Sequence, residues 1–145
     1  MSKLLRLISV SLLGIFLTSG AFAKTEVVYI PKNTGNPYFD SIIKGFEVGA
    51  EKYGYNFSTV APATADATSQ LPFIKAEIQR GVDVIAISPN SNDALNTVFD
   101  QARKKGIIVM VVNGDIPGSE DHRDVAIMPV DFSTVGTAQM TLMGQ

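Results

Sequence analysis

Short apolar runs alternate with stretches of helical periodicity along most of this chain. Each run is bounded by polar or turn-forming residues, and three of the runs are rich in valine and isoleucine. They predict strands at residues 27–30, 57–61, 82–88, 107–112 and 125–130. Because the apolar character within a run is continuous rather than alternating, we expect both faces of the resulting sheet to be covered.

Apolar residues at helical spacing fill the segments between these strands. They predict helices from about Phe39 to Gly54, from about Pro72 to Gly81, and from a cap at Ser91 or Asn92 to Gly106. A fifth strand and the start of a fourth helix follow. With right-handed crossovers, this alternation predicts an α/β fold with a doubly wound parallel sheet.

Polar groups follow the predicted strands, at the edge where open α/β sheets bind ligands. The first strand leads into residues 32–39, the third into 88–92, the fourth into Asn113, Gly114 and Asp115, and the fifth into Asp131. Amides, hydroxyls and carboxylates bind polyols but are poor nucleophiles. Segment 88–92 also fits a turn with a helix cap, and Asn113 and Asp115 fit a turn around Gly114.

Residues 31–39 place an ammonium, an amide and two rings at this edge: Lys32, Asn36, Tyr38 and Phe39. Hydrogen-bonding groups beside flat rings suit a sugar, which has a rim of hydroxyls and an apolar face. The same residues admit a purely structural interpretation. Asn36 before Pro37 is a common helix start, with an amide cap and a proline at the first helical position.

The first 23 residues predict a secretory signal peptide. Lys3 and Arg6 precede an apolar stretch at 7–17, and Ala21-Phe22-Ala23 forms a small-x-small cleavage site. A membrane anchor is the competing interpretation, but the uncharged stretch 7–23 is shorter than the ~20 apolar residues of a span and becomes polar at 18–20. We expect cleavage after Ala23, a mature chain that starts at Lys24, and export to the periplasm.

Composition and missing motifs argue against several classes of function. Twelve basic residues less Lys3 and Arg6 leave ten, against fourteen acidic residues, so a nucleic-acid ligand is not expected. The chain lacks cysteine and has one histidine, His122, in the charged stretch 119–124, so neither a disulfide framework nor a metal site is expected. Glycine-rich dinucleotide, Walker and nucleophile-elbow motifs are also missing, so we expect no cofactor and no enzyme.

Three segments carry a family resemblance: residues 30–39, 81–89 and 106–113. They resemble the type I periplasmic sugar-binding proteins of ABC transporters. Lysine after the first strand places the chain nearest the branch that holds rhamnose and autoinducer-2 receptors. The resemblance implies a monosaccharide or sugar-like signal as ligand and an inner-membrane ABC permease as partner.

The resemblance also implies roles for single residues. The Asn-Pro-aromatic-aromatic run of ribose-type receptors maps onto Asn36, Tyr38 and Phe39, and the ligand-contacting lysine of the autoinducer branch maps onto Lys32. The aspartate that follows the fourth strand in both groups, and the arginine after it in ribose receptors, are replaced by Asn113 and Gly114. This replacement argues against ribose and leaves open whether Asp115 takes over as acceptor.

Such receptors have two similar lobes joined by three crossing segments. The resemblance therefore implies that residues 24–130 are the first portion of the N-terminal lobe, that 131–145 start the second lobe, and that this lobe is largely missing from a fragment. Two other functions remain open. One is a small exported α/β enzyme acting on a carbohydrate through Asp115, Asp131 or Lys32, and the other is the effector domain of a sugar-responsive repressor.

Overall fold

A computed structural model describes residues 23–91, 93–115, 118–128 and 132–144. Its elements are β1 (Glu26–Ile30), α1 (Pro37–Tyr53), β2 (Asn56–Thr59), α2 (Leu71–Arg80), β3 (Val84–Ile87), α3 (Asn96–Lys104), β4 (Ile108–Val112), the 3₁₀ turn η1 (Glu120–His122), β5 (Val125–Ile127) and α4 (Phe132–Met143). All neighbouring strands pair in parallel. The predicted α/β fold with a parallel sheet is confirmed.

The strands lie in the order β2-β1-β3-β4-β5. After β1, the chain adds β2 at one edge of β1 and then crosses over to add β3 at the other edge. The order therefore reverses between β1 and β3, and the loops at the carboxyl ends of these two strands separate there. Open α/β sheets bind ligands in the crevice at this switch point.

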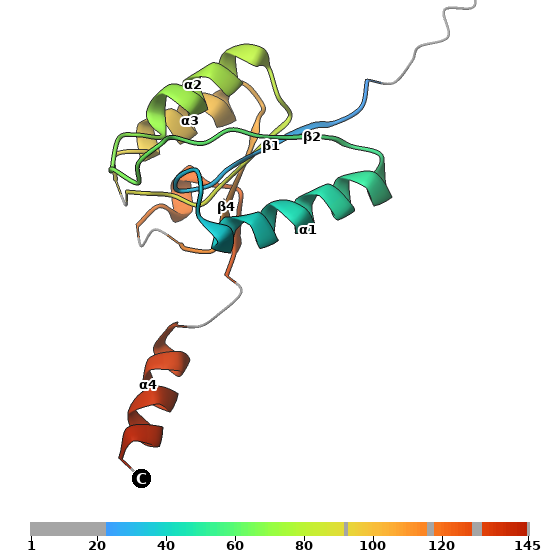
Figure 1. Ribbon diagram of the computed structural model, residues 1–145. Coiled ribbons are helices and arrows are strands. Elements are labelled where there is room, and N and C mark those ends of the chain that lie inside the picture. The colour runs from blue at the N-terminus through green and yellow to red at the C-terminus, as the bar shows by residue number, and fades with distance from the viewer. Residues whose placement is uncertain (1–22, 92, 116–117, 129–131, 145) are drawn as a thin grey trace, which may run out of the picture.

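Helices cover the two faces of the sheet unequally (Figure 1). On one face, α2 and α3 close a large apolar core that includes Ile74, Ile85 and Phe99. On the other face, α1 is the one helix among the described residues that packs on the sheet, with Phe46 stacked on Tyr29 at a centroid separation of 5.0 Å. Side chains alternate in direction along a strand. Accordingly Val28 and Ile30 belong to the first core and Tyr29 to the second, and the predicted double winding is confirmed.

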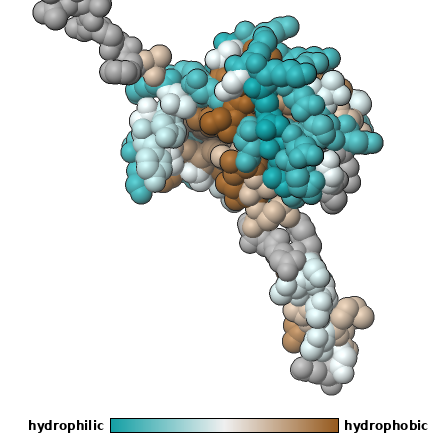
Figure 2. Space-filling model, turned by 180° about the vertical axis from the view of Figure 1, so that it is seen from behind, coloured by the Kyte–Doolittle hydropathy of each residue, from teal (hydrophilic) through white to brown (hydrophobic). Residues whose placement is uncertain are grey.

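The α1 face carries an apolar groove of about 400 Å³. Figure 2 shows apolar side chains gathered in a hollow on the body of the molecule. The groove is lined by residues of α1, of the turn after it and of the strands: Val27, Ile42, Gly45, Phe46, Gly49, Ala50, Tyr53, Tyr55, Phe57, Val84, Met110, Val112 and Ile127. A helix is about 10 Å wide and strands lie about 4.8 Å apart, so one helix covers roughly two strands. Both faces of the sheet carry helices, as expected, but among the described residues α1 covers its face only in part.

Helix ends follow local capping. The amide oxygen of Asn36 accepts from the Tyr38 backbone N–H at 3.1 Å, and Gly54 ends α1 with φ 73°. The third helix departs from its predicted start. The Ser91 hydroxyl accepts from the Ala94 N–H at 3.1 Å and so caps a preceding turn, while regular helix begins only at Asn96. Asn92 lies outside the described residues.

The last helix, α4, stands apart from the sheet (Figure 1). Its apolar side chains Val135, Met140, Leu142 and Met143 are 38% to 81% exposed. In the part of the chain that the structure describes, no helix combines the length and apolar character needed to cross a bilayer. Residues 1–22 of the predicted signal peptide 1–23 lie outside the described part of the chain, and both the signal peptide and the assignment of 131–145 to a second lobe stay predictions.

Candidate functional site

The β1–α1 loop, residues 31–36, lies at the carboxyl end of β1. Its backbone is held by the Thr34 N–H, which donates to the Pro62 carbonyl at 2.9 Å, and it turns at Gly35, where φ is 71°. Beside it is a shallow hollow of about 220 Å³ whose lining includes Asn33, Asn36, Phe39 and Thr59. The predicted sugar-contacting segment therefore borders an open, mixed polar and apolar surface.

Tyr38 and Asn113 meet across this edge of the sheet. The Tyr38 hydroxyl donates to the Asn113 amide oxygen at 2.5 Å, and the Tyr38 side chain is 53% exposed. Asn113 has a left-handed backbone with φ 62°, and its N–H donates to the Ile127 carbonyl at 2.9 Å. Two predicted site residues that lie far apart in the sequence are thus brought together, and both remain within reach of a ligand.

Phe39 is placed differently from Tyr38. Its ring is only 4% exposed and belongs to the core with Tyr29, Ala86 and Val112. It meets the Tyr38 ring edge to face at a centroid separation of 5.3 Å and also borders the hollow. Core packing accounts for most of the ring, so its contact with a ligand stays a prediction.

Lys32 follows β1 with a partly exposed side chain. Its backbone carbonyl accepts from the side-chain amide of Asn90 at 2.8 Å, which links the loop after β1 to the loop after β3. The backbone at Lys32 is therefore held in place. The ligand contact that the family resemblance implies for its side chain stays a prediction.

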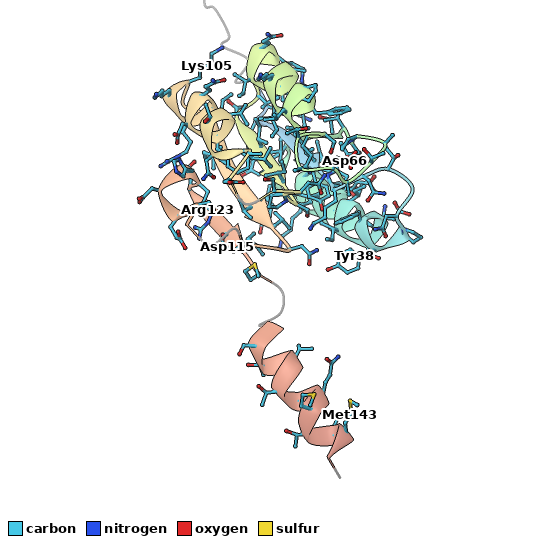
Figure 3. The ribbon with its side chains drawn as sticks, turned by 90° about the vertical axis from the view of Figure 1, so that its left-hand side faces the viewer. Tyr38, Asp66, Lys105, Asp115, Arg123 and Met143 are labelled. Atoms are coloured by element: carbon cyan, nitrogen blue, oxygen red, sulfur yellow. The ribbon has the colours of Figure 1, made fainter. Side chains whose placement is uncertain are left out.

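Asp115 forms a two-point ion pair with Arg123. Arg123 Nε donates to Asp115 Oδ1 at 2.8 Å and Nη2 to Oδ2 at 2.6 Å, with side chains 15% and 29% exposed. The hydrogen bonds that Arg123 donates to Asp115 raise the pKa of the Arg123 guanidinium. Figure 3 shows both residues and Tyr38 at the end of the body opposite Lys105. Asp115, which the sequence left open as an acceptor for the ligand, is therefore already engaged by an arginine of the charged stretch 119–124.

Polar groups that the sequence analysis missed lie buried beneath this edge. Tyr29, Gln70 and Ser88 are each 0% exposed. The Tyr29 hydroxyl lies 2.8 Å from Ser88 Oγ, and burial raises the pKa of Tyr29 to about 12. The only sequence signal for them is polarity within or next to apolar runs. The interpretation of segment 88–92 as a turn with a cap holds for Ser91, which caps a turn, whereas Ser88 is buried against the sheet and bonded to Tyr29 and the Val112 carbonyl.

The remaining predicted site residue, Asp131, lies outside the described residues. Within the described residues no group of three or more histidine, cysteine, aspartate or glutamate side chains could hold a metal ion. His122 pairs instead with Asp100, with Nδ1 2.9 Å from Oδ1. The groups that the fold brings together at the sheet edge are thus hydrogen-bonding groups and one exposed ring.

A family model described as "Periplasmic binding protein domain" matches residues 27–145. The D-allose-binding periplasmic protein of Escherichia coli K12 is 32% identical over 111 residues, which cover 76% of this chain and 36% of that protein. The chain thus spans little more than a third of the length of this relative.

Solved structures give the same match. An ABC transporter solute-binding protein from Clostridium phytofermentas with bound L-rhamnose superimposes with a TM-score of 0.77 at 27% identity, over 83% of this chain and 37% of that one. LsrB from Clostridium saccharobutylicum in complex with AI-2 gives a TM-score of 0.74 at 26% identity, over 81% and 35%. Both are substantially longer than the chain described here.

Proposed function

Because the chain belongs to the periplasmic binding protein family and resembles its type I sugar-binding members, we propose that it contributes one wall of a binding site for a monosaccharide or sugar-like signal. The relatives are binding components of transporters and not enzymes, so binding without turnover is the activity expected at family level. In this proposal, residues 24–130 are the first portion of one lobe and 131–145 begin another.

The observation that carries the proposal is the pairing of Tyr38 with Asn113 at the switch-point edge. An exposed ring, a hydroxyl and an amide converge there from α1 and β4. A sugar can place its apolar C–H face on the ring and hydrogen-bond its hydroxyls to the amide. Asn36 and the Lys32 ammonium supply further partners on the β1–α1 loop.

For the ligand, we propose a rhamnose-like sugar or a furanosyl signal such as AI-2. Two residues support this choice over ribose: Lys32 after β1, and Asn113 where ribose receptors carry aspartate. Relatives that bind L-rhamnose and AI-2 match this chain about equally well, and another binds D-allose. The choice among these ligands therefore rests on the two residues and on the experiment below.

The proposed setting is the periplasm, with an inner-membrane ABC permease as partner. The support is the predicted signal peptide together with the relatives' transporter role. Sequencing the genomic region around this reading frame tests the setting. Neighbouring genes for a permease and an ATPase are the expected result, and their absence from the operon would count against the transport role.

Calorimetric titration tests binding itself. One sample is the chain from residue 24, and the other is a hybrid in which residues 24–128 replace the matching segment of the Clostridium phytofermentas protein. The panel contains L-rhamnose, D-allose, D-ribose and AI-2. We expect roughly millimolar or weaker binding by the chain alone, because a ligand that stays half in water gains little from each hydrogen bond. The hybrid should bind at least one member of the panel much more tightly.

Three outcomes would overturn the proposal. Tight binding by the chain alone would mean that the site is already complete, and hydrolysis of a sugar derivative would favour the exported enzyme. A hybrid that melts cooperatively but binds none of the panel would exclude these sugars as ligands of this wall. Tyr38→Ala in the hybrid then links any binding observed to the site described here.

A further inference from the structure

Gln70 joins two loops of the candidate site from inside the protein. Its side chain is 0% exposed at the start of α2. Nε2 donates to the Pro31 carbonyl at 3.0 Å and to the Ser88 carbonyl at 2.8 Å, while Oε1 accepts from the Asn90 N–H at 2.9 Å. Both N–H bonds and the oxygen of the amide are thus used, and all of them bind backbone.

Ser88 continues this connection to the other face of the sheet. Its hydroxyl donates to the Val112 carbonyl at 2.9 Å. A serine hydroxyl has one proton, so the Tyr29 hydroxyl, 2.8 Å away, donates to Ser88 Oγ. Through its carbonyl and its hydroxyl, Ser88 therefore connects Gln70 on the α2 face with Tyr29 on the α1 face.

The backbone atoms held in this way adjoin the predicted ligand contacts. Pro31 precedes Lys32, and Val112 precedes Asn113. Asn90 in turn donates its side-chain amide to the Lys32 carbonyl at 2.8 Å. The ends of β1, β3 and β4 are therefore cross-linked directly beneath the edge at which a ligand would bind.

If these buried groups made no hydrogen bonds, they would destabilise the folded state, because an amide or hydroxyl removed from water loses its hydrogen bonds to water. Four polar or charged side chains in the described residues are buried: Gln70, Glu77, Ser88 and Ser119. Gln70 and Ser88 both lie under the switch point. Apart from the bond between Ser88 and the Tyr29 hydroxyl, their side-chain hydrogen bonds run to the backbone of loops and strand ends, and so they fix the geometry of that backbone.

We propose that Tyr29, Gln70 and Ser88 form a buried polar frame of positioning residues, which holds the loops after β1, β3 and β4 in the ligand-binding arrangement. The inference rests on the proposed function for its effect on affinity, but the frame itself can be tested without ligand. A loop held in its bound geometry loses less conformational freedom when the ligand arrives. The frame should therefore contribute to affinity beyond its contribution to stability.

The principal variant is Gln70→Met, which keeps an unbranched side chain of similar length and removes all three hydrogen bonds. Ile74→Val is the matched control: Ile74 is also 0% exposed, lies one turn further along α2, and belongs to the apolar core. Tyr29→Phe is a milder second variant, because it removes one hydroxyl and leaves the ring stacked on Phe46. If Gln70→Met does not fold, Tyr29→Phe still tests the frame in the same two measurements.

Amide hydrogen exchange of the whole chain is the first readout. Gln70→Met should speed exchange at least tenfold at Asn90, across residues 32–36 and at residue 113, relative to the α2 and β3 core. Ile74→Val should speed exchange throughout its core without singling out these loops. Equal effects of the two variants on the loops would overturn the frame.

Sugar affinity in the hybrid is the second readout, measured at a temperature where every variant remains folded. Gln70→Met should weaken binding at least tenfold and Tyr29→Phe less, while Ile74→Val should leave affinity within twofold. If Gln70→Met binds like Ile74→Val, the frame has no positioning role. If the unsubstituted hybrid binds no sugar, the proposed function fails, and the exchange experiment still decides whether the frame exists.

Discussion

The Tyr38 hydroxyl donates a hydrogen bond to the amide oxygen of Asn113, and this contact joins the first turn of α1 to the end of β4. It pairs a ring that is 53% exposed with a residue whose backbone is left-handed. A ligand that binds at this edge either leaves the Tyr38–Asn113 hydrogen bond in place or breaks it and bonds to the two side chains itself. The two side chains can therefore be tested both separately and as a pair.

Tyr38→Phe should keep the ring and remove only the hydroxyl. We expect the free energy of unfolding to change by less than about 1 kcal/mol, because the lost hydrogen bond is accessible to water. Sugar affinity of the hybrid should fall. Tyr53→Phe, at the far end of α1 and 64% exposed, is the control and should leave affinity unchanged. Equal affinity for the two variants would exclude the Tyr38 hydroxyl from the binding site.

Substitutions at Asn113 can test its backbone conformation and its side chain separately, because its φ of 62° favours glycine or asparagine over other residues. Asn113→Gly keeps this conformation and removes the amide, so stability should change little while sugar binding weakens. Asn113→Ala should cost about 1 to 2 kcal/mol more than glycine, since a β-carbon is strained in left-handed backbone. Urea denaturation of both variants measures the difference. Equal stability of the two would show that the loop relaxes out of this conformation.

The two rings of the site should respond differently to truncation. Phe39→Ala should lower the free energy of unfolding by about 3 to 5 kcal/mol, because the ring is 4% exposed. Tyr38→Ala should cost much less stability. In the hybrid, losing one ring that contacts the sugar should weaken binding by about 1 to 3 kcal/mol. Calorimetry below the melting transition tests this. Unchanged affinity for Phe39→Ala would assign that ring to packing alone.

Alkaline stability should depend on Tyr29. Its pKa is raised from 10.0 to about 12, chiefly because burial disfavours the charged phenolate. The folded state therefore keeps the proton longer than the unfolded state. The resulting contribution, about 2 to 3 kcal/mol, is fully present below pH 10 and is lost as the pH rises through 12.

Denaturation at several alkaline pH values, with tyrosinate absorbance as the second signal, measures this loss. Tyr29→Phe should flatten the dependence in that window. Tyr53→Phe should not, because Tyr53 is exposed. The same pH profile for both variants would contradict the assignment to Tyr29.

Export should leave Lys24 at the amino terminus of the mature protein. The expectation rests on Lys3, Arg6 and the Ala21-Phe22-Ala23 site. Mass spectrometry of the periplasmic fraction measures it. An intact chain that still begins at Met1 in the cytoplasm would contradict both the cleavage and the proposed setting.

The sheet and α1 could be predicted because their signals are local. Continuous valine and isoleucine runs marked β3 and β4, and Gly54 marked the end of α1 through its left-handed backbone. Strand ends were less accurate: the expected 82–88 run is Val84–Ile87 in the structure. An apolar run includes residues that are buried beside a strand as well as those that pair within it.

The polar contacts of the site could not be predicted in the same way, because they depend on partners distant in sequence. In the sequence, nothing distinguishes Gln70 from other polar residues at a helix start. Only the folded sheet places the carbonyls of Pro31 and Ser88 within hydrogen-bond distance of its side chain. Arg123 lies in an evidently charged stretch, and only the fold presents Asp115 to it. The partial cover of the α1 face could not be predicted from the sequence either. An apolar run indicates a buried strand, but it does not indicate which helix covers that strand.

The place of β1 between β2 and β3 has a consequence for how the chain acquires its structure. β1 is synthesised first but pairs with two strands made later, so neither of its edges is satisfied early. Sheets built from pairings between distant segments fold slowly, because each pairing must first close a long loop. We therefore expect slow, late assembly of the sheet, in which β1 is closed on both sides only after β3 has been made and has crossed to its far edge.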